Sequence, residues 1–113
     1  MRKPNKVIRI IQPLEFIKEL HLPRAIPKVY LVDQRAGRAY LRQGFVTVPL
    51  WAEKRGKDYL LYYIAHELAH PLSASHLHDF AFYKTFIKIC PTNLQYFELE
   101  YKPTAAKFGI SKH

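Results

Sequence analysis

Residues 59–70, YLLYYIAHELAH, predict the element around which the chain folds. The first seven of these residues are apolar nearly all round, as expected for a helix buried at the centre of a domain. His66 and His70 are four residues apart, so they lie on one face of that helix, one turn from each other. Each imidazole can present a ring nitrogen to one metal ion, at the roughly 2.0–2.1 Å that Zn–N bonds require. Glu67 lies beside the first histidine, where its carboxylate can reach a water on the metal without being a ligand.

The size and composition of the chain predict a single small domain over residues 1–113. Hydrophobic residues make up 49% and aromatic residues 14% of the chain, enough for a modest core. The one cysteine, Cys90, lies in an apolar helical pattern, which favours a buried, inert thiol over a nucleophile. Arg9, Gln12 and Glu15 interrupt the apolar residues that follow the basic N-terminus. We therefore expect a cytoplasmic protein with no signal peptide and no membrane contact.

The chain is strongly basic, with 18 Lys and Arg against 9 Asp and Glu and a formal net charge of +9. The basic residues are spread over the N-terminal arm, residues 35–42 and the turn at residues 54–57. Such an excess attracts anionic partners, nucleic acid included. No basic helix with interleaved aromatic residues stands out, however, so a solvated basic surface is the preferred interpretation.

The region ahead of the motif helix is predicted to be mostly β structure. Residues 6–11 are β-branched and suit a short strand or an arm. Residues 13–20 suit a short helix with proline in its first turn. One face of that helix would carry Leu14, Ile17 and Leu20.

Three further segments predict strands and a hairpin. Residues 28–33 and 38–43 alternate in polarity, and Gly37 between them supplies the freedom that a hairpin turn needs. Residues 45–51 suit a third strand, which Pro49 ends or confines to a sheet edge because proline cannot donate a ladder hydrogen bond.

The second half of the chain is predicted to be helical. Asp58 suits the N-cap or the first turn of the motif helix. Pro71 clashes with the carbonyl four residues earlier, so we expect that helix to end or bend at His70. A helix from residue 78 or 79 to 90 and a last one over residues 93–101 follow. Strands first and helices after them predict an α+β fold with one helical layer against a small sheet.

A catalytic zinc site usually has three protein ligands and a water, so the motif needs a third ligand. His78 is the preferred candidate, because it opens a helix after a loop and Asp79 beside it can orient a ligand imidazole. His76 is the nearest alternative. Glu98 and Glu100 are later carboxylates that can serve instead.

The H-E-x-x-H motif, followed by His78-Asp79 and then Phe82, resembles the compact zincin metallopeptidases of the SprT-like, WLM and minigluzincin group. The resemblance covers roughly residues 28–90 and is most specific over residues 66–82. It implies one zincin-like domain over residues 1–113, in which a small, mainly antiparallel three-stranded sheet packs against the central motif helix and further helices. A later histidine completes the site in the SprT-like and WLM types, whereas gluzincins use a glutamate. Pro71 departs from the group's pattern.

The resemblance also implies an activity. The chain would be a zinc metalloendopeptidase acting on protein or peptide substrates, with one Zn²⁺ per chain. The implied ligands are His66, His70 and His78. Hydrolysis would use a zinc-activated water with Glu67 as general base, and Tyr101 or His76 to stabilise the oxyanion. Residues 45–50 would form the edge strand that binds an extended substrate.

Two other functions compete with this interpretation. The first is a catalytically inactive zincin-like binding or regulatory module whose metal serves stability; Glu67 speaks against it, because a structural site needs no base. The second is a nucleic-acid-associated basic protein. No sequence pattern selects an oligomeric state.

Overall fold

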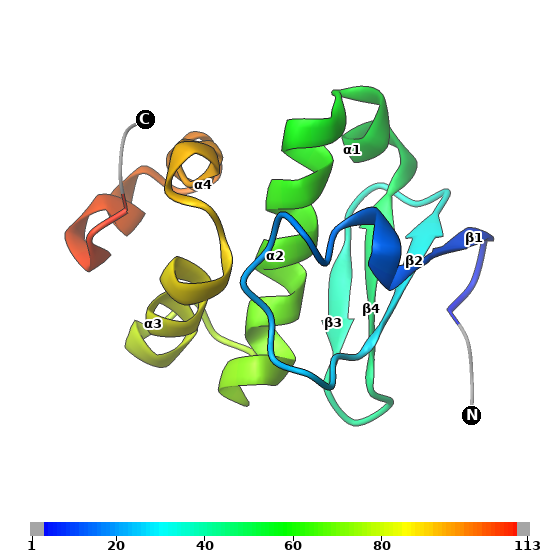
Figure 1. Ribbon diagram of the computed structural model, residues 1–113, viewed down its shortest axis with the longest axis horizontal. Coiled ribbons are helices and arrows are strands. Elements are labelled where there is room, and N and C mark those ends of the chain that lie inside the picture. Colours follow the sequence, from blue (N-terminus) through cyan, green and yellow to red (C-terminus); the bar gives the residue numbers. More distant parts are fainter. Residues whose placement is uncertain (1–3, 111–113) are drawn as a thin grey trace.

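The computed structural model describes residues 4–110, so the first residues of the basic N-terminal arm lie outside the described part. A four-stranded sheet lies on one side of the long helix α2, and the helices α3 and α4 lie on its other side (Figure 1). In chain order the elements are β1 (Val7–Ile11), η1 (Pro13–Glu15), β2 (Lys28–Val32), β3 (Arg38–Tyr40), β4 (Phe45–Pro49), α1 (Leu50–Lys54), α2 (Lys57–Ser73), α3 (Phe80–Ile89), η2 (Thr92–Leu94), α4 (Tyr96–Tyr101) and η3 (Pro103–Phe108).

The sheet has the order β1-β2-β4-β3 and is mixed. β1 is antiparallel to β2, β2 is parallel to β4, and β4 is antiparallel to β3. The α+β class is confirmed, but the expectation of three strands is wrong: the sheet has four, with two antiparallel pairs and one parallel pair. Residues 7–11 form a fourth strand because they pair along β2.

The predicted hairpin between residues 28–33 and 38–43 is also wrong, because β4 lies between β2 and β3. The cause is burial on both faces of β2. Val29 and Leu31 face the main core, while Tyr30 and Val32 belong to a second small cluster with Phe45. A strand buried on both faces favours the sheet interior, where it has a neighbour on each side.

The expectation that residues 45–50 lie at a sheet edge is overturned by the same strand order. β4 is an interior strand, and all of its residues are buried. Pro49 is its last residue and directly precedes α1, so its missing N–H interrupts the ladder only at the end of the strand. The two edges of the sheet are β1 and β3.

Helix α2 begins after Gly56, whose φ of 114° is open to glycine, and Asp58 lies in its first turn as predicted. The helix does not end at His70. It continues to Ser73, because Pro71 falls in the last turn and removes a single helical hydrogen bond there. Ala74 then takes the left-handed conformation and closes the helix through its N–H to the Pro71 carbonyl, at 3.2 Å.

Helix α3 matches its prediction closely. Asp79 is its N-cap and accepts a hydrogen bond of 3.0 Å from the Phe82 N–H. The inward stripe is buried, with Phe82 and Phe86 completely so, and the free Cys90 at the end of the helix is buried as expected. Within residues 4–110 no helix is both long and apolar enough to cross a membrane.

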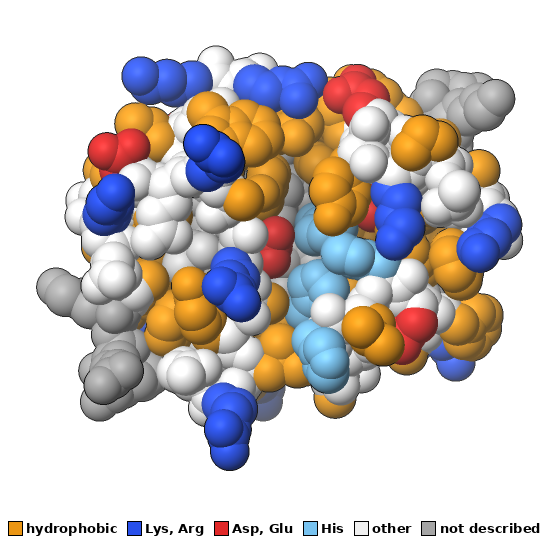
Figure 2. All heavy atoms as spheres, turned by 180° about the vertical axis from the view of Figure 1, so that it is seen from behind, with side chains coloured by type: hydrophobic (Ala, Val, Ile, Leu, Met, Phe, Trp, Pro, Cys, Tyr) orange, Lys and Arg blue, Asp and Glu red, His pale blue; other side chains and the backbone are white. Residues whose placement is uncertain are grey.

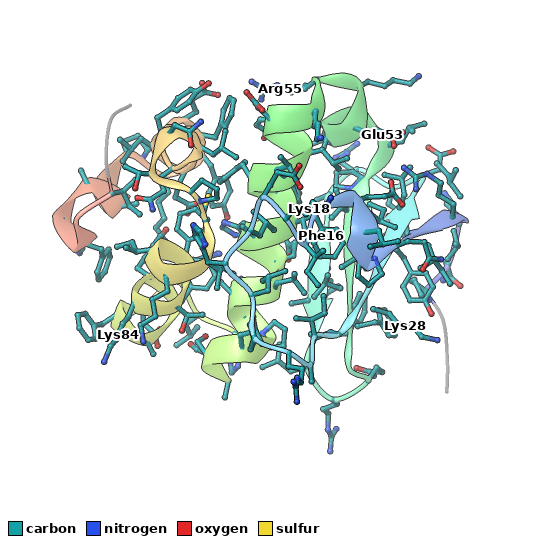
Figure 3. All side chains as sticks on the ribbon, in the orientation of Figure 1. Phe16, Lys18, Lys28, Glu53, Arg55 and Lys84 are labelled. Carbon is teal, nitrogen blue, oxygen red and sulfur yellow. The ribbon has the colours of Figure 1, made fainter. Side chains whose placement is uncertain are left out.

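The helix predicted over residues 13–20 is reduced to the short 3₁₀ turn η1. Leu14 and Ile17, expected to share one face with Leu20, are 82% and 44% exposed, whereas Leu20 is buried. Phe16, labelled in Figure 3, is buried instead together with Leu20. The two residues that face the core, Phe16 and Leu20, are therefore four positions apart, and residues 13–20 have no continuous apolar face.

Gly37 allows the chain before β3 to approach both β4 and α2. A Cβ atom at this position would overlap the Thr47 carbonyl oxygen and the Tyr63 ring. The Gly37 N–H donates to the Tyr63 hydroxyl at 2.8 Å, which ties the start of β3 to α2.

We predict that Gly37→Ala lowers the free energy of unfolding by about 1–3 kcal/mol, the usual cost of overpacking. Urea unfolding followed by circular dichroism measures the loss. Gly44→Asn is the control, because Gly44 has open space around it and a left-handed backbone that asparagine accepts. Equal stability of the Gly37→Ala and wild-type proteins would contradict this packing.

Candidate metal centre

One face of α2 forms the floor of a pocket of about 520 Å³. The residues on this face recur at helical spacing, so they lie in a single stripe. They are Tyr59, Tyr62, Tyr63, His66, Glu67 and His70. Residues 36–39 of β3 and the loop before it line one side of the pocket, and His76, His78 and Tyr101 also line it. Figure 2 shows histidine side chains gathered in a hollow of this face, with an acidic side chain beside them.

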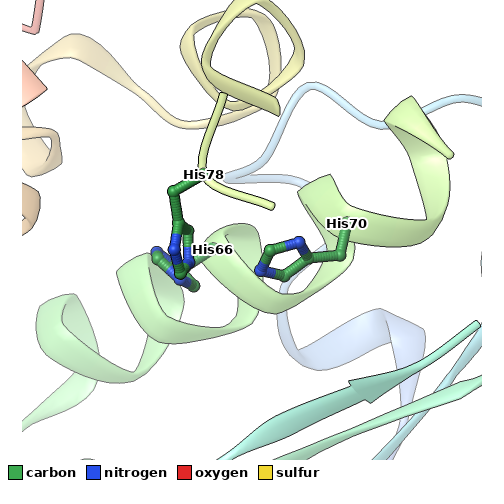
Figure 4. Close-up of side chains that lie close together, drawn as sticks. All are labelled: His66, His70 and His78. Atoms are coloured by element: carbon green, nitrogen blue, oxygen red, sulfur yellow. The ribbon is translucent and has the colours of Figure 1, made fainter. Parts of the chain in front are cut away.

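His66, His70 and His78 come together in this pocket, with their rings turned toward one another (Figure 4). One ring nitrogen of each lies within 4.8 Å of the others, and the Nε2 atoms of His66 and His78 are 3.1 Å apart. Two atoms bound to one tetrahedral zinc ion are about 3.3 Å apart. The His66–His78 pair is therefore already at ligand spacing, and the ring nitrogen of His70 is at most about 1.5 Å farther from its neighbours than that spacing.

His66 is held from behind by Glu98 of α4. Its Nδ1 donates to the Glu98 Oε1 at 2.7 Å, which leaves Nε2 facing the other two histidines. The Glu98 side chain is fully buried and also accepts hydrogen bonds from the hydroxyls of Tyr62 at 2.7 Å and Tyr83 at 2.6 Å. Its carboxylate therefore has three donors.

These contacts set the protonation of the pair. Burial opposes the charge on Glu98, but the hydrogen bond and charge of His66 and the two tyrosine hydroxyls lower the pKa of this carboxyl below its ordinary value. Burial likewise disfavours the imidazolium form of His66, and Glu98 outweighs it, so the pKa of His66 is raised. Glu98 is thus an ionised acceptor that orients the ring.

The other two imidazoles are neutral at pH 7. Burial lowers the pKa of His70, whose Nδ1 donates to the Ser75 carbonyl at 2.8 Å. Burial and the neighbouring imidazoles of His66 and His70 lower the pKa of His78 to about 4. The neutral imidazole is the form that binds a metal ion, so a proton on the Nε2 of His66 would be released when an ion binds.

The other candidates for a third ligand lie elsewhere. His76 lines the pocket but is outside the cluster, and Glu98 stands behind His66. Glu100 is exposed and pairs with Arg55 at 3.4 Å. Within residues 4–110, the side chains close enough to share one ion are the three histidines alone.

The expected role of Asp79 is wrong. It caps α3 and accepts hydrogen bonds of 3.1 Å from the Ser75 hydroxyl, so it shapes the loop that carries His78 and does not hold the His78 ring. A carboxylate at a helix N-terminus satisfies backbone N–H groups first, which is why this residue is used as a cap.

Glu67 is buried beside the cluster and lines the same pocket. Burial raises the pKa of its carboxyl to about 7, with His66 opposing the rise. A carboxyl with a pKa near 7 can both accept and return a proton at neutral pH. Tyr101 and His76, the candidates for oxyanion stabilisation, also line the pocket, and the Tyr101 ring centroid is 5.5 Å from that of His66.

The role of Glu98 as the partner of His66 was not predicted. The available signal was a carboxylate in the apolar pattern of residues 94–99, where an unpaired charge would be costly to bury. Tyr62, four residues before His66 on the same helix face, was a second signal.

Comparisons with known protein families, curated proteins and solved structures found no match to this chain.

We predict that Glu98→Ala lowers the free energy of unfolding of the metal-free protein by about 3–5 kcal/mol, because it leaves three buried donors without their acceptor. Urea unfolding measures the change. Glu100→Ala is the matched control two residues away; its exposed pair with Arg55 contributes about 0–1 kcal/mol. Similar losses in the two variants would show that the buried network does not stabilise the fold.

Proposed function

We propose that this chain is a zinc-dependent peptidase that hydrolyses peptide bonds with Glu67 as general base. The observation that carries the proposal is the meeting of three imidazole nitrogens and one buried carboxyl in a single pocket beside an edge strand. The imidazoles would bind a metal ion, the carboxyl would transfer a proton and the edge strand would hold an extended peptide. The proposal depends on these three parts lying together.

The donor set suits zinc. Three imidazole nitrogens are a usual ligand set for catalytic zinc, with a fourth position left for water or substrate. His66 and His70 each have Nδ1 engaged by an acceptor, Glu98 and the Ser75 carbonyl, which fixes the rings with Nε2 available. Zinc held there would supply Lewis-acid activation of water and of the scissile carbonyl.

Glu67 supplies the proton transfer. Its carboxyl lies in the pocket and, among residues 4–110, belongs to no group of three or more side chains that could share an ion. It is therefore available to take a proton from the attacking water and return it to the leaving amine. This position also argues against an inactive module. A purely structural site has no use for a buried carboxyl with a raised pKa in the same pocket as its ligands.

The edge strand β3 replaces residues 45–50 as the proposed substrate platform. The Arg38 N–H donates to the Thr47 hydroxyl of β4 at 3.0 Å. Alternate residues of an antiparallel strand direct their backbone groups to opposite sides, so the N–H and C=O of Ala39 point away from β4. Ala39 lines the pocket, and an extended chain can pair with it there.

The basic surface supports nucleic-acid binding less well as the main function. On the face shown in Figure 2, Lys and Arg side chains are scattered around the hollow and do not form one continuous stripe. A phosphate backbone is usually tracked by a continuous basic patch.

We predict one zinc ion per chain, bound by His66, His70 and His78. Element analysis after dialysis should find about one equivalent in the wild-type protein and loss of zinc in His78→Ala. His76→Ala is the matched control, two residues away in the same pocket, and should keep its zinc. Loss of zinc in His76→Ala and its retention in His78→Ala would make His76 the third ligand instead.

We predict that Glu67→Gln keeps the fold and the zinc but lowers the rate of peptide hydrolysis about 10²–10⁴-fold. Glutamine has nearly the same size, but its amide cannot accept the proton. Turnover of an unfolded protein substrate, followed by gel electrophoresis, measures the rate. Turnover equal to that of the wild-type protein would rule out this mechanism.

We predict that a non-hydrolysable extended peptide protects the Ala39 amide from hydrogen exchange. The amides of Val46 and Val48 belong to the interior strand β4 and should be protected with or without the peptide. Mass spectrometry of the exchanged protein makes the comparison. New protection confined to residues 54–57 would place the docking surface on the basic turn instead.

A further inference from the structure

We propose that the pocket recognises a bulky apolar or aromatic side chain of its polypeptide substrate, at a position about three residues from the bond that is cut. This inference rests on the proposed peptidase function and adds the class of substrate that the site selects. The experiments below distinguish failure of this inference from failure of the proposed peptidase function.

The stripe of α2 that carries the site is divided into two halves. His66, Glu67 and His70 occupy its C-terminal half, and three tyrosines, Tyr59, Tyr62 and Tyr63, occupy its N-terminal half. Both halves line the same pocket, so the hollow extends beyond the metal centre by about two helical turns.

Trp51 forms part of the far end of this hollow. It lies at the start of α1, and its indole N–H donates to the Arg35 carbonyl at 2.7 Å. Its ring centroid is 5.8 Å from that of Tyr59 and 5.7 Å from that of Tyr63. The ring is therefore fixed in place, and yet it is 40% exposed toward the pocket and solvent.

The wall of the pocket on the side of β3 is lined by the small residues Ala36, Gly37 and Ala39 and by Arg38. Ala36 and Gly37 line the pocket just before the edge strand, and Gly37 is held to Tyr63 by its N–H. Because Gly37 lies directly against the Tyr63 ring, the exposed ring of Trp51 and the small, exposed Ala36 are the parts of the pocket that can receive a ligand side chain, and they suit one that is broad and apolar. Aromatic pairs gain further from edge-to-face contact.

The spacing fixes where on the substrate this side chain lies. Tyr59 precedes His66 by seven residues, a rise of about 10 Å along the helix. An extended peptide advances about 3.3 Å per residue, so the same distance spans about three residues. A chain paired with Ala39 of β3 runs along this hollow, because β3 and α2 line it together.

The first experiment measures binding without hydrolysis, in the Glu67→Gln variant of the whole 113-residue chain, with and without zinc. The probes are eight-residue peptides free of tryptophan that contain one Phe or, at the same position, Ala. Trp51 is the single tryptophan of the chain, so its fluorescence reports on this end of the pocket. We expect the Phe peptide to bind about tenfold more tightly than the Ala peptide and to shift the Trp51 emission. Equal affinities, measured by calorimetry, would overturn the inference.

Two variants test the location. Trp51→Ala removes the indole ring. Ala36→Leu places a larger side chain at an exposed position and so fills the space opposite that ring. In both, we expect the Phe peptide to bind no better than the Ala peptide. Phe80→Ala is the control, because Phe80 is 70% exposed and does not line the pocket; it should change neither affinity. Loss of discrimination in the control, or its retention in Ala36→Leu, would refute the assignment.

The last experiment locates the cut. The zinc-loaded wild-type protein is incubated with a peptide series in which Phe is moved along the sequence, and the products are identified by mass spectrometry. We expect the cut to move with Phe at a constant separation of about three residues. Cleavage that ignores Phe would refute the inference and leave the peptidase proposal standing. Selective binding of the Phe peptide without any cleavage would refute the peptidase proposal and leave the recognition site standing.

Discussion

The buried carboxylate of Glu98 is the interaction on which the site depends most. A charge with no exposure to water costs several kcal/mol unless donors surround it. The donors here are Tyr62 and His66 from α2 and Tyr83 from α3, while Glu98 itself belongs to α4. Satisfying one carboxylate therefore fixes three helices relative to one another. It also turns the His66 ring so that its free nitrogen meets His78, which means that the stability of the helical layer and the geometry of the candidate metal centre have a common cause.

On the side of α2 that faces the sheet, a glycine determines how closely the edge strand β3 approaches the helix. The chain before β3 lies close to the helix because Gly37 has no side chain, and the Tyr63 hydroxyl accepts its N–H. Tyr63 belongs to the same helical stripe as Glu67, so the strand lies along the row of residues that includes the proposed base. Ala39, two residues after Gly37 in the chain, then presents backbone groups to the pocket that also contains the histidines. The fold thus places an edge strand, a buried carboxyl and a cluster of three histidines side by side without any long loop.

Much of the helical half could be predicted from the sequence, because helical spacing and caps are local signals. The motif helix, the helix after Asp79 and the nearness of His78 to the motif all follow from positions close together in the chain. The sheet could not be predicted in the same way. Alternation in β2 indicates one buried face, and only the tertiary structure shows that Tyr30 and Val32 are covered on the other. The partner of His66 was missed for a similar reason, since Glu98 is 32 residues away and nothing local links the two. Pro71 misled the prediction because its effect depends on how many helical turns remain after it.

X-ray absorption spectroscopy at the zinc edge tests the central claim most directly, because it reports the atoms around the ion in the intact chain. With one equivalent of zinc bound, the account predicts three imidazole nitrogens at about 2.0–2.1 Å and one further light atom from water. In His78→Ala the number of imidazole neighbours should fall by one, or zinc should be lost. A wild-type spectrum with two imidazoles or fewer, or one unchanged by His78→Ala, would contradict the assignment of this pocket as a three-histidine zinc centre.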